Sequence, residues 1–399
     1  MNILGHFSRI TTSGRSFIPQ IDGLRFLAIM SVIAFHVRSI CSYHFHASPQ
    51  GLTIEGDPIN DIFAVGNYGV SLFFAISGFI LSLPFARQYL CDGNRVGLRE
   101  YYVRRVTRIE PPYVIQLALM FLLCALVLRH LPSHPNLYQN DAWAGFALKH
   151  VLASLVYADA FIYGVHPYPN LVLWSLAIEV QFYLLAPFLA RVFKIRGARS
   201  RRMLLAGLIL LLPLAIWNVA GFVGHSYQIY FSLAGNLQFF LVGFLLADLY
   251  VLDRPATAVR TFKWDVLLLL AAVAIVCLRN CFWLDFILPG LIFICFQAAF
   301  CGTLAFRCLG NPWITTVGGM CYTIYMYHWL MISVLVRVTG RWQTHILWLD
   351  LLIQFIVMSA GIIVLCAILF ALFERPFMRR NWPSAVWSAL RAAKTMAAG

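Results

Sequence analysis

Two ionisable side chains stand out in the apolar segment IDGLRFLAIMSVIAFHV, residues 21–37, because charged groups are costly in a hydrophobic environment. Arg25 and His36 are eleven residues apart, which in a helix is three turns plus about 20°, so both would face one direction roughly 16 Å apart. A histidine can take a proton from a hydroxyl near neutral pH, and an arginine below it could hold an anionic part of a substrate. The alternative is a histidine that bonds a neighbouring helix and an arginine at a lipid headgroup.

A second group of candidate residues is the arginine cluster in REYYVRRVTRIEPPY, residues 99–113. Arg105 and Arg108 are three residues apart and Arg104 and Arg108 four, so a helix would bring the guanidiniums together. Arginine binds phosphate bidentately, which suits a phosphorylated substrate. The alternative is contact with anionic membrane lipid. The cluster is short, and no recognised nucleic-acid module surrounds it, so we expect no nucleic-acid partner.

Two further segments place polar groups within apolar runs. In LWSLAIEVQFYLL, residues 173–185, Glu179 could accept a proton, orient His36, or pair with Arg38 or Lys149, and Trp174 has an ordinary explanation at a membrane interface. In CYTIYMYHWL, residues 321–330, polar side chains recur every three residues and form a slanted ridge that could contact a substrate or bond neighbouring helices. The members of this ridge are Tyr322, Tyr325 and His328. No G-x-S-x-G, H-E-x-x-H or Walker-type glycine loop occurs, and we expect no metal.

The elements that must position these residues are membrane spans. The chain has 399 residues, 61% of them hydrophobic and 12% charged, with a mean hydropathy of +0.77. Soluble domains are about 45–50% apolar and about 25% charged, so a soluble enzyme, a disordered chain and a disulfide scaffold are excluded. Apolar runs of span length predict an all-α polytopic membrane bundle of about ten helices. The predicted spans are 23–40, 66–85, 113–131, 174–193, 203–222, 229–250, 264–282, 285–306, 314–336 and 346–373.

The distribution of charge predicts the orientation of this bundle. The formal net charge is +14, and alternating ten spans from a cytoplasmic N-terminus places 24 of the 30 Lys and Arg residues inside. Both termini are therefore expected in the cytoplasm, as an N-terminal tail, 1–20, and a C-terminal tail, 379–399, around a ten-span domain, 21–378. Residues 146–165 contain Lys149, His150 and Asp159, and we predict a lateral or re-entrant helix on the outer side.

Several of these motifs together resemble the acyltransferase 3 family, integral membrane enzymes that O-acylate extracytoplasmic glycans. The resemblance covers residues 18–378 and rests on motifs in the family's order. These are IDGLR…AFH, GVSLFFAISGFIL (69–81), YVRRVTRI (102–109), WSLAIEVQFYLL (174–185), YTIYMYH (322–328) and ERPF (374–377). Cys321 stands where the family usually has serine, which weakens any role for that hydroxyl.

The resemblance implies a role for each candidate residue. His36 corresponds to the essential histidine of the first span and Glu179 to an acidic position, so both are catalytic candidates. The residues implied in binding acyl-CoA are Arg25, Arg105 and Arg108. The candidates for contact with the acceptor substrate are Trp174, Tyr322, Tyr325 and His328.

The function expected from these observations is transfer of an acyl group, most simply acetyl, from cytosolic acyl-CoA to a hydroxyl of an extracytoplasmic glycan. The expected location is the bacterial inner membrane, and the expected partners are acyl-CoA, the glycan, membrane lipid and polysaccharide-synthesis machinery. The rival interpretation is a transporter or flippase for a glycan or lipid-linked sugar, with the buried charges lining a path. Its usual internal repeat with broken helices is not found in this sequence.

Overall fold

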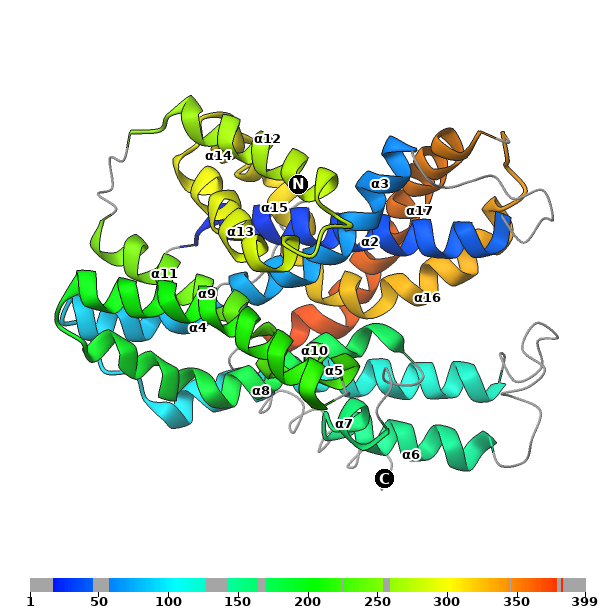
Figure 1. Cartoon of the computed structure of the whole chain (residues 1–399). Coiled ribbons are helices and arrows are strands. Elements are labelled where there is room, and N and C mark those ends of the chain that lie inside the picture. Colours follow the sequence, from blue (N-terminus) through cyan, green and yellow to red (C-terminus); the bar gives the residue numbers. More distant parts are fainter. Residues whose placement is uncertain are drawn as a thin grey trace, which may run out of the picture.

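The computed structural model describes residues 17–45, 57–126, 143–163, 170–223, 226–253, 259–344, 346–378 and 382. These residues are helical and include no strand, which confirms the predicted all-α class (Figure 1). The first half contains α2 (Pro19–Phe45), α3 (Pro58–Ala64), η1 (Val65–Tyr68), α4 (Gly69–Leu90), α5 (Leu98–Leu126), α6 (Trp143–Leu155), α7 (Asp159–Tyr163), η3 (Leu171–Leu173), α8 (Trp174–Leu189) and η4 (Ala190–Lys194). The proposed tails, 1–20 and 379–399, lie almost entirely outside the described residues.

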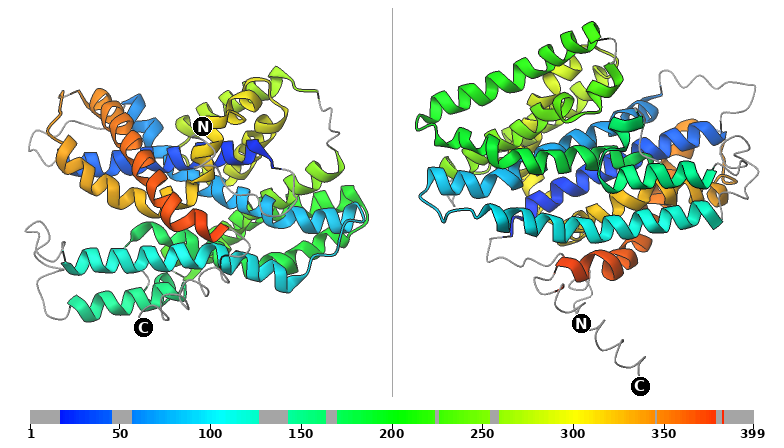
Figure 2. Two further views of the ribbon diagram at one scale, coloured as in Figure 1. Left: turned by 180° about the vertical axis from the view of Figure 1, so that it is seen from behind. Right: turned by 90° about the horizontal axis from the view of Figure 1, so that it is seen from below.

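The second half continues the helical bundle. It contains α9 (Ala198–Val223), α10 (Ser226–Tyr230), α11 (Leu233–Leu252), α12 (Phe262–Cys277), α13 (Leu284–Cys301), α14 (Leu304–Leu309), α15 (Pro312–Gly319), α16 (Cys321–Thr339), α17 (Leu347–Leu369), η5 (Phe370–Glu374) and η6 (Arg375–Met378). The long helices α2, α4, α5, α9 and α16 run roughly along one common direction (Figures 1 and 2).

The number of spans differs from the ten predicted. In the described part of the chain, eight helices are long and apolar enough to cross a membrane, and α15 with α16 makes a ninth that is bent by 71°. The remaining predicted span, 264–282, corresponds to α12, whose 16 residues fall short of the ~20 that usually cross a bilayer. The third span also starts earlier than expected, because the basic segment is continuous with it in α5 rather than a preceding loop.

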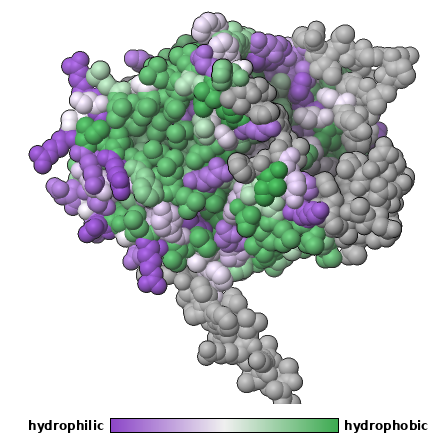
Figure 3. Space-filling model, turned by 60° about the horizontal axis from the view of Figure 1, so that its bottom comes forward, coloured by the Kyte–Doolittle hydropathy of each residue, from purple (hydrophilic) through white to green (hydrophobic). Residues whose placement is uncertain are grey.

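The surface fits a protein embedded in lipid. Figure 3 shows a broad hydrophobic band across one face, with hydrophilic residues gathered toward one end. Large apolar side chains are exposed along α9 and α12, among them Leu210, Leu211, Phe222, Leu269 and Leu270. Apolar helices that leave such side chains uncovered are typical of contact with acyl chains. The chain is therefore an integral, multi-pass membrane protein.

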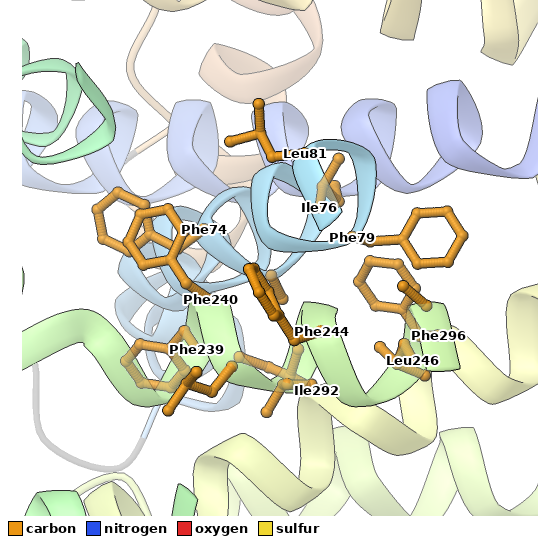
Figure 4. Close-up of a cluster of buried hydrophobic side chains, with 14 of the residues drawn as sticks. Phe74, Ile76, Phe79, Leu81, Phe239, Phe240, Phe244, Leu246, Ile292 and Phe296 are labelled. Carbon is orange, nitrogen blue, oxygen red and sulfur yellow. The ribbon is translucent and has the colours of Figure 1, made fainter. Parts of the chain in front are cut away.

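The tightest packing in the bundle joins α4 to α11. Aromatic and aliphatic side chains of α4, α11 and α13 gather between these helices, with Phe74 stacked on Phe240 at 4.8 Å between ring centroids (Figure 4). The two backbones approach closely at glycines, because a Cβ on Gly78 would lie 2.2 Å from the Phe240 carbonyl oxygen and one on Gly243 would lie 2.3 Å from the Phe79 nitrogen. Small residues at such crossings are the usual means of joining helices in membranes.

This crossing predicts an unusually harmful small substitution. We expect Gly243→Ala to lower the melting temperature in detergent, with an overpacking cost of about 1–3 kcal/mol, because the added methyl group meets three backbone atoms of α4. Gly207→Ala is the matched control, since nothing lies within 4 Å of a Cβ at that position of α9. Equal melting temperatures for the two variants, measured by fluorescence-detected unfolding, would contradict the close approach of α4 and α11.

An ionic network joins α9 to α11. Asp248 is completely buried and accepts hydrogen bonds from the guanidiniums of Arg201 and Arg202, and Arg202 also pairs with Asp253 at 2.8 Å. A buried carboxylate is tolerated when cations and hydrogen bonds surround it. These basic residues therefore hold the bundle together as well as contributing to its charge.

Residues 146–165 include a half-length helix rather than a full span. Helix α6 and the following α7 lie beside α5 (Figures 1 and 2), where Tyr113 of α5 donates to the Ser154 carbonyl at 2.8 Å and Tyr157 donates to Glu110 at 3.0 Å. His150 and Asp159 pair at 2.7 Å and are both buried. Of the polar residues that argued against a full span, His150 and Asp159 thus bond each other, and a lateral or re-entrant helix on the outer side stays a prediction.

Candidate active site

His36 lies on α2 where that helix faces α16. Its ring centroid is 5.1 Å from that of His328 and 5.1 Å from that of Trp329. The residue is partly buried, and its buried Nδ1 has no hydrogen-bond partner among the described residues. A buried nitrogen without a hydrogen-bond partner costs about 1–3 kcal/mol of folding free energy, so such an atom in a folded protein often has a functional role.

His328 is fully buried on the facing side of α16. Its Nδ1 lies 2.7 Å from the backbone oxygen of Tyr325, one turn earlier in the same helix. A carbonyl oxygen only accepts, so Nδ1 carries the hydrogen in this bond, and Nε2 of the neutral ring is an acceptor. That Nε2 is buried and has no partner in the described structure.

Arg25 lies on the same face of α2 as His36, nearer the start of the helix. Its guanidinium pairs with Asp22 at 2.6 Å and lies within electrostatic range of Cys321 and Glu179. Because Cys321 begins α16 and His328 lies two turns later, the two helices run side by side in the same direction. The prediction that the eleven-residue spacing puts Arg25 and His36 on one face is confirmed.

Glu179 of α8 bonds two hydroxyl groups. Its Oε1 accepts from Ser77 of α4 at 2.5 Å and from Tyr183 of α8 at 2.5 Å. Among the described residues, Glu179 has no hydrogen bond to His36 and no ion pair with Arg38 or Lys149, and Arg38 donates to Asn60 at 2.6 Å. Any effect of this carboxylate on His36 must therefore pass through other groups.

Arg105 and Arg108 lie near the start of α5, as the cluster predicted. Arg105 donates to the Tyr101 carbonyl at 2.9 Å and its guanidinium carbon lies 3.7 Å from the centre of the Tyr101 ring, while its Nε is buried without a partner. Arg108 makes no ion pair within the described residues. Both arginines lie within electrostatic range of Tyr183, so they retain donors near the Glu179 group.

The hydroxyls of the α16 ridge are used for helix packing. Tyr322 donates to the Ile109 carbonyl of α5 at 3.0 Å, beside two prolines that interrupt the bonding of that helix. Tyr325 donates to the Val172 carbonyl at 3.0 Å and lies 2.5 Å from the Ser175 hydroxyl. The interhelical alternative therefore describes both tyrosines.

Trp174 also packs away from the histidine pair. Its ring lies 4.6 Å from that of Phe231 and 6.4 Å from that of Phe74, between centroids, at the edge of the aromatic core. The structure thus brings it to the α4–α8 side of the bundle.

These polar groups lie one after another in space between the arginines of α5 and the histidines of α2 and α16, and we call them the polar line. The arginines lie within electrostatic range of Tyr183, hydrogen bonds join Tyr183 and Ser77 to Glu179, and Glu179 lies within electrostatic range of Tyr325. The Tyr325 carbonyl then bonds His328, whose ring touches that of His36. The members of the polar line are Arg105, Arg108, Tyr183, Ser77, Glu179, Tyr325, Ser175, His328 and His36.

Three residues of this site were not found from the sequence. Ser77, Ser175 and Trp329 contact Glu179, Tyr325 and His36 respectively. A serine in an apolar helix is common, and Ser77 can be recognised as a site residue only from its hydrogen bond to Glu179, 102 positions away. Adjacency to His328 was the one local signal for Trp329. In the described ranges, no group of three or more His, Cys, Asp or Glu residues could hold a metal ion.

The fold and the polar line define a multi-pass helical membrane protein in which two histidine rings lie side by side between α2 and α16. The profile of an acyltransferase domain, acyltransferase 3, matches residues 18–371. The chain belongs to the acyltransferase 3 family, which confirms the resemblance noted in its motifs.

Curated relatives point the same way. The chain is 26% identical to peptidoglycan O-acetyltransferase OatA of Listeria monocytogenes over 94% of its own length and 57% of that protein. It is 28% identical to O-acetyltransferase OatA of Staphylococcus aureus over 59% of its own length and 35% of that protein. It is 23% identical to a putative O-acetyltransferase of Staphylococcus aureus over 94% of its own length and 61% of that protein. The chain thus spans about three fifths of the first and third of these relatives. No solved structure matches it.

Proposed function

We propose that the protein is an O-acyltransferase of the bacterial inner membrane, with both termini in the cytoplasm. It moves an acetyl group from cytosolic acetyl-CoA to a hydroxyl of a glycan outside the cytoplasm. Family membership and the O-acetyltransferase names of its relatives support the reaction class. The acceptor class is a cell-surface polysaccharide, of which the peptidoglycan named for the Listeria relative is one example. The synthesis machinery of that polysaccharide is the expected neighbour.

The polar line is the observation that carries this proposal. Arg105 and Arg108 offer unpaired guanidinium donors at one end of it, where phosphates of a coenzyme can bind. His36 offers an imidazole at the other end, separated from Arg25 by roughly 16 Å along α2. A donor with its phosphates near Arg105 and Arg108 could extend its thioester along the polar line to His36. Arg25 is largely neutralised by Asp22, so we assign it a supporting role in holding the donor.

The proposed reaction follows from the position of His36. The Nε2 of His36 takes the proton of the acceptor hydroxyl while the hydroxyl oxygen bonds to the thioester carbonyl carbon. The carbon–sulfur bond then breaks, the electron pair leaves with sulfur, and the protonated imidazole returns the proton to give free coenzyme A. A covalent route through an acyl-histidine is the variant of the same chemistry.

The remaining candidates support this site rather than react. Tyr322 and Tyr325 hold α16 against α5 and α8, and through Tyr325 they set the position of His328. Glu179 is the carboxylate of the polar line, and Ser77 and Tyr183 donate to it. We propose that this group makes polar contacts with the extended arm of the acyl donor. Trp174 is proposed to border the acceptor at the α8 end.

The test is acetyl transfer by the purified full chain in nanodiscs. Radiolabelled acetyl-CoA is supplied with glycan fragments from the producing cell, and label on the glycan is measured together with free coenzyme A. We expect label to move to glycan hydroxyls as alkali-labile esters. If the protein binds no coenzyme A and moves no acetyl group but carries glycan across vesicle membranes, the transporter alternative replaces this proposal.

A further inference from the structure

The contact between His36 and His328 leaves two nitrogen atoms without partners. His36 Nδ1 and His328 Nε2 are both buried and unbonded, and their rings are 5.1 Å apart between centroids with 42° between the planes. Imidazoles at this separation can bring facing nitrogens within hydrogen-bond distance by a small rotation of either ring. Two buried ring nitrogens without partners, one able to donate and the other able to accept, therefore indicate that these two rings can bond each other.

The backbone of α16 decides what His328 can offer. Because the Tyr325 carbonyl holds the hydrogen on Nδ1, His328 Nε2 is a lone pair rather than an N–H. The same carbonyl lies behind the ring and favours any positive charge that spreads into it. Tyr325 is in turn held by Val172 and Ser175, so the orientation of His328 is anchored in α8 as well as in α16.

His36 needs such a partner when it accepts a proton. Its ring lies 5.1 Å, between centroids, from those of Phe35, Trp329 and His328, and of these three side chains His328 is the one that can accept a hydrogen bond. Glu179, which could have balanced an imidazolium, bonds Ser77 and Tyr183 instead. An imidazolium in apolar surroundings is costly unless its N–H groups are bonded.

We propose that His328 is a positioning residue for the transfer reaction, accepting a hydrogen bond from His36 Nδ1–H through its own Nε2. This inference rests on the proposed function. The bond fixes the hydrogen of neutral His36 on Nδ1, so that Nε2 is free to take the acceptor's proton, and it stabilises the imidazolium that results. A buried carboxylate does this in Ser-His-Asp triads. Here a neutral imidazole backed by a backbone carbonyl takes that place.

The test separates the two nitrogens of His328. An asparagine amide reaches the Nδ1 position and can keep the bond to Tyr325, whereas a glutamine can present an oxygen near the Nε2 position. We expect His328→Asn to lower kcat about tenfold, with KM for acetyl-CoA unchanged. This loss is smaller than the 10²–10⁴-fold effect of removing a general base, because His36 itself is kept. His328→Gln should recover part of the lost kcat. Tyr327→Phe, at a neighbouring buried hydroxyl without a partner, is the control and should keep the wild-type kcat.

Other outcomes overturn the inference in distinguishable ways. Equal losses in His328→Asn and His328→Gln, with equally lowered melting temperatures, would make His328 a packing residue. A raised KM for the glycan with unchanged kcat would make it an acceptor-binding residue. Full activity of His328→Asn in an enzyme that His36→Ala inactivates would refute the role of His328 alone. A wild-type protein that transfers no acetyl group would instead refute the proposed function.

Discussion

Replacing His36 with alanine should lower kcat for acetyl transfer by about 10²–10⁴-fold, the contribution of a positioned general base. The variant keeps Arg105, Arg108 and the Glu179 group, so the acyl donor should still bind. The loss should therefore fall on kcat, with little change in the dissociation constant of coenzyme A. Acetyl transfer to glycan and calorimetry with coenzyme A measure the two effects on one preparation.

The control for this prediction is Ser39→Ala, on the same helix and close to one turn after His36. The Ser39 hydroxyl bonds the Phe35 carbonyl of its own helix, so its loss should leave kcat within about twofold. The melting temperatures of both variants in detergent check that the bundle is intact. Transfer by His36→Ala at the wild-type rate would remove the proposed reacting group, whatever the behaviour of His328.

The spans could be predicted because burial in lipid imposes long apolar runs, and helices such as α4, α11 and α17 cover the expected segments. Two details of the prediction differ from the structure for separate reasons. The basic start of α5 is helical although it lacks the composition of a span, because helix formation needs no apolar run, whereas α12 is apolar but has only 16 residues. A hydropathy pattern reports where lipid lies and says less about where a helix begins.

The site was predictable only where its residues share a helix. Arg25 and His36 follow from helical spacing, as do Arg105 and Arg108. The partners of Glu179 do not, because Ser77 is 102 positions away and no spacing rule links them. The sequence also could not say that the hydroxyls of Tyr322 and Tyr325 donate to backbone carbonyls, or that the ring of His328 lies beside that of His36. Those facts depend on how α2, α5, α8 and α16 pack together.

The double variant Arg105→Ala with Arg108→Ala should weaken coenzyme A binding on the order of 100-fold. Charge-assisted hydrogen bonds contribute about 1.5–3 kcal/mol each, so losing both guanidiniums removes about 3 kcal/mol or more of binding free energy. Arg105 has a buried, unpartnered Nε and Arg108 makes no ion pair in the described ranges, so neither is already neutralised by a carboxylate. Isothermal titration with coenzyme A in nanodiscs measures the change.

Arg104→Ala is the control for this variant, since it removes one guanidinium next to Arg105 in α5. The Arg104 side chain is 46% exposed and pairs with Glu100 at 3.4 Å, so its charge is both solvated and balanced by a carboxylate. We expect its loss to change coenzyme A affinity less than about threefold, as exposed pairs contribute 1 kcal/mol or less. Equal weakening by Arg104→Ala and the double variant would reduce the cluster to a general positive field. Unchanged affinity in the double variant would assign Arg105 and Arg108 to anionic lipid, and the donor would then have to reach His36 from Arg25, along α2.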